Sequence, residues 1–153
     1  MLKWIAGGAV TFLALRYLLR LNRVADTINS RTGIRVHKVG LSGIRLKARV
    51  LLQNPNPIEL NMQYPFVNIT YKGTSLGTST VRNELIGIPG NGEQSFEIDI
   101  QSAGWFSLMQ VLGGDLVKRI RSGEKVVLDI VAITSTVVNK IPYTREEAIK
   151  LNI

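Results

Sequence analysis

Alternating apolar and polar side chains dominate the chain from Ser42 onward and predict a body built of β-strands. Between residues 43 and 53 the even-numbered positions are apolar (Ile44, Leu46, Ala48, Val50, Leu52), and three of the positions between them are basic (Arg45, Lys47, Arg49). A period of two sends these sets to opposite faces of a strand, one toward a core and one toward solvent. The same reasoning predicts strands at 58–62, 66–71, 74–76, 81–88, 95–100 and 126–134, with 137–143 continuing the last strand or forming a terminal one.

Turn-forming residues separate these predicted strands. Asn54-Pro55-Asn56-Pro57 ends the first strand, because proline lacks an N–H donor and forces extended geometry on the residue before it. Lys72-Gly73 predicts a hairpin turn, and Pro89-Gly90-Asn91-Gly92 predicts another turn.

One segment of the body has the pattern of a helix. We expect this helix over Ala103–Leu112, capped by Ser102 and ended by Gly113-Gly114, with a second short turn at 116–120. Its apolar residues are too many for a solvated helix, so we expect them to be buried over an open edge or end of the strands. They are Trp105, Phe106, Leu108, Met109 and Leu112.

The first thirty residues follow a different pattern. Trp4 to Leu15 is a stretch of twelve residues without a charge, and Arg16, Arg20 and Arg23 follow it at the spacing of one helix face. We therefore predict one helix over about residues 2–29 that stops near Gly33. Its uncharged part covers roughly 18 Å of a hydrocarbon core about 30 Å thick, which suits a marginal span or insertion into one leaflet.

The residues expected to anchor this helix in a membrane are Trp4, Ile5, Val10, Phe12, Leu13, Leu15 and Tyr17, with Trp4 and Tyr17 at the interfaces. Packing inside a protein assembly is the alternative role. A cleaved signal peptide is disfavoured, because no small-x-small cleavage site follows the apolar stretch. The expected organisation is an N-terminal helix at 1–30, a β body at 31–148 and a tail at 149–153.

The positive charge of the chain is concentrated near its start. The formal net charge is +8, yet residues 1–50 hold ten Lys and Arg against one acid, Asp26, and the remainder holds nine against ten. This asymmetry indicates an anionic partner, either lipid head groups or nucleic acid. The candidate contacts are Arg16, Arg20 and Arg23 on the helix and Arg45, Lys47 and Arg49 on the strand. No aromatic residues interleave with these cations, so a stacking platform for single-stranded nucleic acid is not evident.

The sequence offers no recognisable catalytic or metal-binding motif, so we expect no enzyme activity, metal or cofactor. There are no cysteines, and His37 is the single histidine, which leaves too few ligands for a zinc site. Glu97 and Asp99 share one strand face, but alternation predicts that both face solvent.

A resemblance to a known family begins at the first predicted strand. The run Leu51-Leu52-Gln53-Asn54-Pro55-Asn56-Pro57 resembles the Asn-Pro-Asn signature of the type 2 late embryogenesis abundant or water-stress and hypersensitive-response (WHy) family. The Gly-containing hairpin at 71–76 and the helix before the last long strands are also similar. The resemblance implies a fibronectin-III/Ig-like sandwich of about seven strands with one inserted helix, without a catalytic centre. It also implies a stress-protective role and an N-terminal membrane anchor. The basic strand is not part of the family signature.

Three functions remain open at this point. The first is a membrane-anchored accessory, stress-protective or interaction module. The second is a structural subunit of a larger assembly, such as a phage virion, which packs through its N-terminal helix or self-associates. The third is nucleic-acid binding through the basic N-terminal third.

Overall fold

The computed structural model describes residues 28–153, and in this range the protein is mainly β, as the alternation predicts. The described residues form nine strands and two helices, in place of the expected seven strands or so and one helix. The strands are β1 (Asn29–Gly40), β2 (Gly43–Gln53), β3 (Leu60–Gln63), β4 (Phe66–Tyr71), β5 (Thr74–Ser79), β6 (Leu85–Ile88), β7 (Glu93–Ser102), β8 (Val127–Val138) and β9 (Ile141–Asn152). The helices are α2 (Trp105–Leu112) and α3 (Gly114–Arg121).

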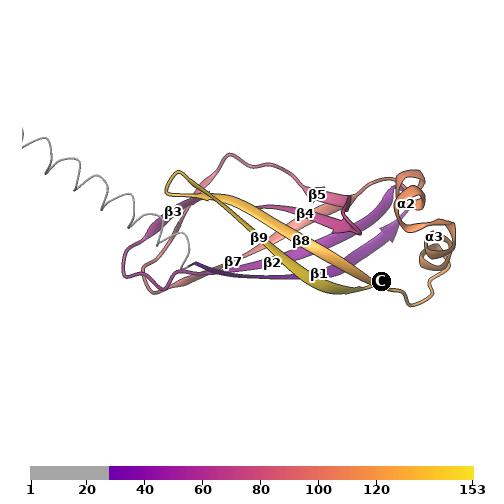
Figure 1. Ribbon diagram of the computed structural model, residues 1–153, viewed down its shortest axis with the longest axis horizontal. Coiled ribbons are helices and arrows are strands. Elements are labelled where there is room, and N and C mark those ends of the chain that lie inside the picture. The colour runs from indigo at the N-terminus through magenta and orange to yellow at the C-terminus, as the bar shows by residue number, and fades with distance from the viewer. Residues whose placement is uncertain (1–27) are drawn as a thin grey trace, which may run out of the picture.

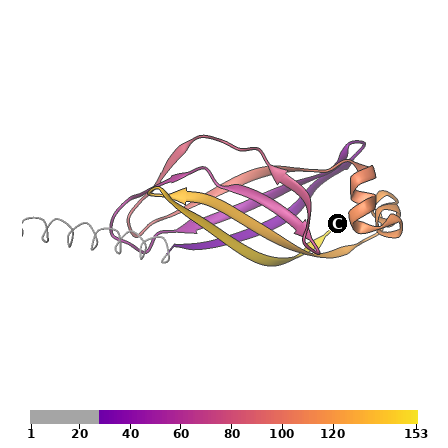
Figure 2. The same ribbon diagram turned by 45° about the horizontal axis from the view of Figure 1, so that its top comes forward.

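All strand pairs are antiparallel and belong to one sheet, with the order β1-β2-β7-β5-β4-β8-β3-β6 and with β9 paired to β8. Side chains join the first strand to the last. The Thr32 amide of β1 donates to Glu147 Oε2 of β9 at 2.6 Å, and the Ser30 and Tyr143 hydroxyls lie 3.2 Å apart. The sheet therefore curls until β1 lies beside β9, while α2 and α3 sit together at one end (Figures 1 and 2).

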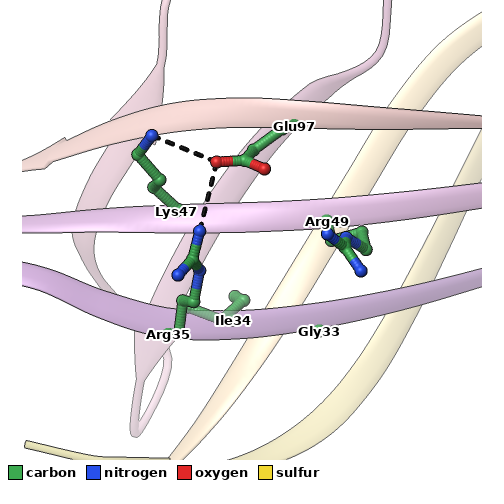
Figure 3. A pocket seen from close by; sticks show the side chains of 6 residues that line it. All are labelled: Gly33, Ile34, Arg35, Lys47, Arg49 and Glu97. Atoms are coloured by element: carbon green, nitrogen blue, oxygen red, sulfur yellow. Dashed lines mark hydrogen bonds and ion pairs between the residues drawn. The ribbon is translucent and has the colours of Figure 1, made fainter.

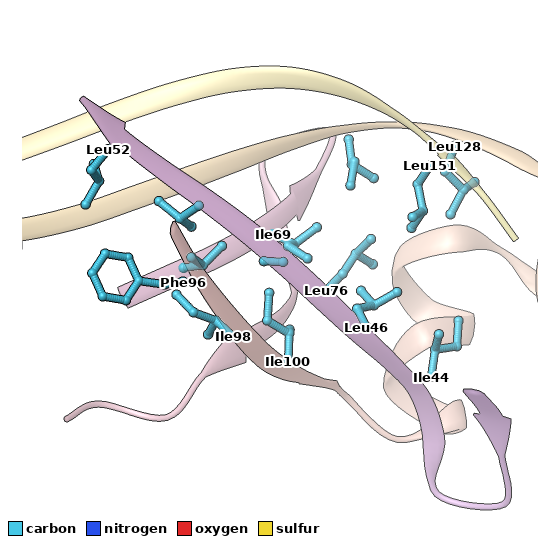
Figure 4. Close-up of a cluster of buried hydrophobic side chains, with 14 of the residues drawn as sticks. Ile44, Leu46, Leu52, Ile69, Leu76, Phe96, Ile98, Ile100, Leu128 and Leu151 are labelled. Carbon is cyan, nitrogen blue, oxygen red and sulfur yellow. The ribbon is translucent and has the colours of Figure 1, made fainter. Parts of the chain in front are cut away.

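The core fills the inside of this curled sheet. The even-numbered side chains of β2 all point inward, as predicted, and meet apolar residues from the other strands (Figure 4). Val67 and Ile69 of β4, Ile98 and Ile100 of β7 and Ile130 of β8 are each at most 5% exposed. Within the described residues every buried side-chain nitrogen or oxygen has a hydrogen-bond partner. The buried polar side chains in this range therefore carry no unpaired polar atom.

The predicted helix over residues 2–29 lies almost wholly outside the described residues, but its expected end is wrong. Asn29 already belongs to β1, and Gly33, the expected stop, lies in the middle of that strand. Period-two burial explains this, because Ile34 and Val36 pack against the core. Ile28 is only 3% exposed, so the core already includes residue 28, ahead of the expected start of the body at 31.

The C-terminal residues also differ from expectation. Strand β8 continues to Val138, and a turn at Asn139-Lys140, both with positive φ, leads into a full-length β9. Residues 149–152, expected to form part of a tail, lie in β9, where Leu151 is buried. β9 lacks a clean alternation because most of its side chains are partly or fully exposed. Its pairing with β8 is what defines it.

Helix α2 begins later than predicted and has a different N-terminal residue. Its N-cap is Gly104, and Ser102 does not cap it. The Ser102 hydroxyl instead accepts a hydrogen bond from the Ile44 amide at 2.8 Å and donates one to the Ala103 carbonyl at 2.8 Å. Only Leu108 and Leu112 of α2 are buried, whereas Phe106 and Met109, which we expected in the core, are exposed. In the adjacent α3 the buried residues are Val117 and Ile120.

Candidate anion-binding face

Three predicted cation positions share one exposed face of the sheet. Arg45, Lys47 and Arg49 alternate with the buried residues of β2 and therefore point outward together. Across the ladder to β7 they lie opposite Gln101, Asp99 and Glu97, respectively. On the other side, Arg35 of β1 lies opposite Lys47. We call the outward side chains of Arg35, Arg45, Lys47, Arg49, Glu97 and Asp99 the basic face.

Glu97 is the centre of an ion-pair network on this face (Figure 3). Its Oε1 lies 3.0 Å from Lys47 Nζ and 3.2 Å from Arg35 Nη2, and Lys47 Nζ is also 3.8 Å from Asp99 Oδ1. The hydrogen bond and charge of Lys47, followed by the charge of Arg35, lower the pKa of the Glu97 carboxyl below its ordinary value of 4.5. Because the network is exposed to solvent, it aligns the side chains but contributes little to stability.

Arg49 differs from Arg35 and Lys47 because no described acid pairs with it. It lies opposite Gly33 of β1 in the sheet register, and Gly33 has no side chain to fill the space above the strand. The result is a shallow open depression of about 430 Å³, lined by Gly33, Ile34, Arg35, Lys47, Arg49 and Glu97 (Figure 3). Arg45 likewise has no acidic partner among the described residues, and its Nε donates to the neutral Gln101 amide oxygen at 3.3 Å. Two guanidinium groups thus stay available to an anion.

The spacing of these two arginines decides which anions suit the face. Arg45 and Arg49 are four residues apart on one strand face, about 13 Å at the usual rise of a strand. A single phosphate is too small to bridge them. A surface that carries many separate negative charges, such as a layer of lipid head groups, matches this spacing better.

The other predicted site residues fall into two groups. Arg16, Arg20, Arg23 and the predicted membrane-anchor residues from Trp4 to Tyr17 lie outside the described residues. Asn54-Pro55-Asn56-Pro57 forms the connection between β2 and β3, at the end of the sheet away from α2 (Figure 1). Asn54 is 1% exposed, and its side-chain nitrogen lies within hydrogen-bond distance of the carbonyls of Ile58, Ile88 and Pro89. Its Oδ1 accepts from the Asn56 amide at 3.0 Å. These contacts give the motif a structural role.

The described part of the chain offers few groups for other chemistry. No cluster of three His, Cys, Asp or Glu side chains in residues 28–153 could hold a metal ion. His37 is exposed at an irregularity in β1, where the pairing with β2 shifts register. No helix in the same range is long and apolar enough to cross a membrane.

Comparisons with known proteins establish similarity of fold alone. No protein-family model and no curated protein matches the chain. A crystal structure of a protein from Archaeoglobus fulgidus is similar with a TM-score of 0.52 at 10% identity, over 83% of this chain and 96% of the other. A solution structure from Arabidopsis thaliana has a TM-score of 0.48 at 12% identity, over 83% of this chain and 80% of the other. An X-ray structure of a structural-genomics target also has a TM-score of 0.48, at 10% identity, over 82% and 85%.

Sequence reasoning missed two residues that shape the basic face. Arg35 is not among the predicted contact residues, and Glu97, predicted only to face solvent, also pairs with Lys47 and Arg35. Glu97 is 62 residues from Arg35 in the chain and 50 from Lys47, so no local pattern reveals their contact. The available signal was the alternation of acids on β7 in step with the cations of β2.

Proposed function

We propose that this protein is a non-enzymatic β-sandwich module that attaches to anionic membranes and serves there as an accessory or interaction domain. The observation that carries the proposal is the basic face, on which Arg45 and Arg49 have no acidic partner among the described residues. Their separation suits a charged surface better than a small ligand. The lipid phosphates and carboxylates of an anionic leaflet supply such a surface.

The finer description of the fold belongs to the same proposal. The curled antiparallel sheet, with its core enclosed between β1-β2-β7 and β4-β8-β9, supports a sandwich of the fibronectin-III type. The buried Asn54 turn supports the resemblance to the type 2 late embryogenesis abundant or WHy family. A protective role in water stress is what that resemblance would add.

The burial of Ile28 in the core supports attachment through the N-terminus. Ile28 is buried, and β1 starts directly after it. The apolar residues from position 2 to 21 are therefore separated from the body by only a few residues. A membrane segment at that position would hold the basic face of β1 and β2 close to the lipid surface.

Vesicle flotation of the full chain tests the proposal. The chain should float with vesicles made of equal parts phosphatidylcholine and phosphatidylserine, and Arg45→Ser/Arg49→Ser should weaken the charge-dependent part of binding. A loss of about 25-fold is expected for two cations that each contribute about 1 kcal/mol near an anionic surface. Lys72→Ser/Lys150→Ser removes the same charge from the β4–β5 turn and from β9, and it serves as the matched control.

Two results would contradict the proposal. The first is a full chain that stays unbound on anionic vesicles. The second is an equal loss in both double variants, because net charge alone would then account for binding. A full chain that does not bind vesicles but forms a large defined assembly would favour the structural-subunit role. A salt-sensitive shift of duplex DNA without vesicle binding would favour nucleic acid.

A further inference from the structure

The end of the molecule that carries the helices exposes large apolar side chains. Leu41, in the turn between β1 and β2, is 98% exposed, and on α2 Phe106 is 75% and Met109 47% exposed. The turn and the helix lie beside each other (Figures 1 and 2), and Trp105 Nε1 at the start of α2 donates to the Gly40 carbonyl of the turn at 2.9 Å. We call Leu41, Phe106 and Met109 the apolar tip.

Folding does not explain why these three residues are apolar. The side of α2 that packs on the core is made by Leu108 and Leu112, four residues apart and both buried. Phe106 and Met109, three residues apart, occupy a different side of the same helix. Since a side chain that stays in water gains nothing from being apolar, the apolar tip suits burial against something outside the described residues.

Positive charge surrounds the apolar tip. Lys38 and Arg45 face each other across the base of the β1–β2 hairpin, and both are exposed. The guanidinium of Arg121 lies 5.4 Å from the centre of the Trp105 ring, and Lys118 is one turn before it on α3. Of the acids nearby, Glu124 is paired with Arg119 at 2.8 Å, which leaves Asp115 in the first turn of α3. Cations therefore outnumber the acids around the tip.

We propose that the apolar tip inserts into the interface of an anionic lipid bilayer, while Lys38, Arg45 and Arg121 contact the head groups. Bulky apolar residues within a ring of cations match the two layers of such a surface, hydrocarbon below and negative charge above. The tip lies at the end of β1 opposite to Asn29, so this contact is separate from any attachment through residues 2–21. The contact would give the body a point of attachment in addition to residues 2–21, and it shares Arg45 with the basic face.

The absence of cysteine in the chain allows a direct test. The full chain with Leu41→Cys carries an environment-sensitive fluorophore at the tip, and Thr144→Cys carries the same fluorophore at an exposed position on β9, near the other end of the sheet. With vesicles of equal parts phosphatidylcholine and phosphatidylserine, the emission of the Leu41→Cys label should move to shorter wavelength. Tyr143, next to Thr144, contacts Ser30 and Ile28, so the Thr144→Cys label reports attachment at the end where β1 begins. Any response of this label should be unaffected by a substitution at the tip. The Leu41→Cys label should not respond to phosphatidylcholine alone.

A second substitution in the labelled chain checks that the shift depends on the tip. Phe106→Ser should remove most of the shift. Leu85→Ser should leave the shift unchanged, although Leu85 on β6 is 78% exposed and therefore matches Phe106 at 75%. Because both leucine and phenylalanine are exposed in these positions, neither change threatens the fold.

Each remaining outcome contradicts the proposal. If the chain floats with anionic vesicles but the Leu41→Cys label is unchanged, the tip does not insert, and attachment through the rest of the chain stands. If the chain does not float, both proposals fail. A shift that also occurs with phosphatidylcholine alone would show that insertion of the tip does not depend on Lys38, Arg45 and Arg121. A shift that appears on raising the protein concentration without lipid shows that a second copy of the chain covers the tip instead.

Discussion

The two ends of the sheet differ in which side chains they bury and which they expose. At the β2–β3 connection a polar residue, Asn54, is buried, and at α2 an aromatic residue, Phe106, is left in water. Asn54 satisfies its buried amide with carbonyl groups from two separate segments. Phe106 leaves the packing of α2 to Leu108 and Leu112. The first end is therefore organised by the needs of the fold, and the second contains residues that the fold does not require.

Substitutions of Leu108 and Phe106, two residues apart on α2, should give the largest difference in stability. Leu108 is 1% exposed, so Leu108→Ala should lower the free energy of unfolding by about 2–5 kcal/mol through lost burial and the cavity left behind. Phe106→Ala, two residues earlier, should change it by less than about 0.5 kcal/mol. Urea titration followed by circular dichroism measures both values. Equal losses in the two variants would show that Phe106 belongs to the core and would remove the basis for the apolar tip.

The Asn54 turn should show the second-largest effect. Asn54→Ala removes the donor that faces three buried or half-buried carbonyls, and unsatisfied groups of this kind cost about 1–3 kcal/mol. Gln53→Ala is the matched control, because the Gln53 side chain is exposed and donates to the exposed Glu93 carboxylate at 3.3 Å. A thermal melt of Asn54→Ala that overlays the parent would mean that the carbonyls find water instead, and that the motif does not hold the turn.

These two regions also show how far the sequence predicts the structure. β2 is predicted well because one of its faces is apolar and the other is charged. The turn after β2 is also predicted well, because proline has no N–H donor and ends a strand ladder whatever the rest of the fold. The apolar tip is not predicted, because five apolar residues in a short helix indicate burial, and only the packed structure shows that Leu108 and Leu112 suffice. Ser102 fails as a cap for a similar reason, since its partner, the Ile44 amide, is 58 residues away.

The strand pairings explain the other differences. Gly33 was expected to stop a helix, yet it lies in β1, where the ladder to β2 decides the conformation. β9 carries Pro142 and the adjacent acids Glu146 and Glu147, which hide its alternation. Its full length depends on pairing with β8. A local sequence pattern cannot show which distant segments will pair as strands.

The basic face, which runs along the middle of the sheet between these ends, should show the smallest effect, and it is the one that depends on pH. The pKa of the Glu97 carboxyl is lowered by Lys47 first and Arg35 second. The ion pairs are therefore complete above the ordinary carboxyl pKa of 4.5 and are lost as the pH falls through the lower value in the folded protein. Protonation frees Lys47 and Arg35, so binding to anionic vesicles should strengthen at acidic pH, while stability falls only slightly because the network is exposed.

Glu97→Gln should reproduce that gain at neutral pH. Removal of one negative charge next to the lipid surface should raise the affinity for phosphatidylserine-containing vesicles by up to about fivefold, and the variant should then respond less than the parent to acidification. Glu93→Gln removes the same charge from the same strand, but Glu93 contacts the neutral Gln53 amide and no described cation, so it should give a smaller gain. Flotation of the three proteins at neutral and acidic pH separates the two sources of charge. Identical gains from both variants would mean that only net charge matters and that the arrangement around Glu97 plays no part in binding.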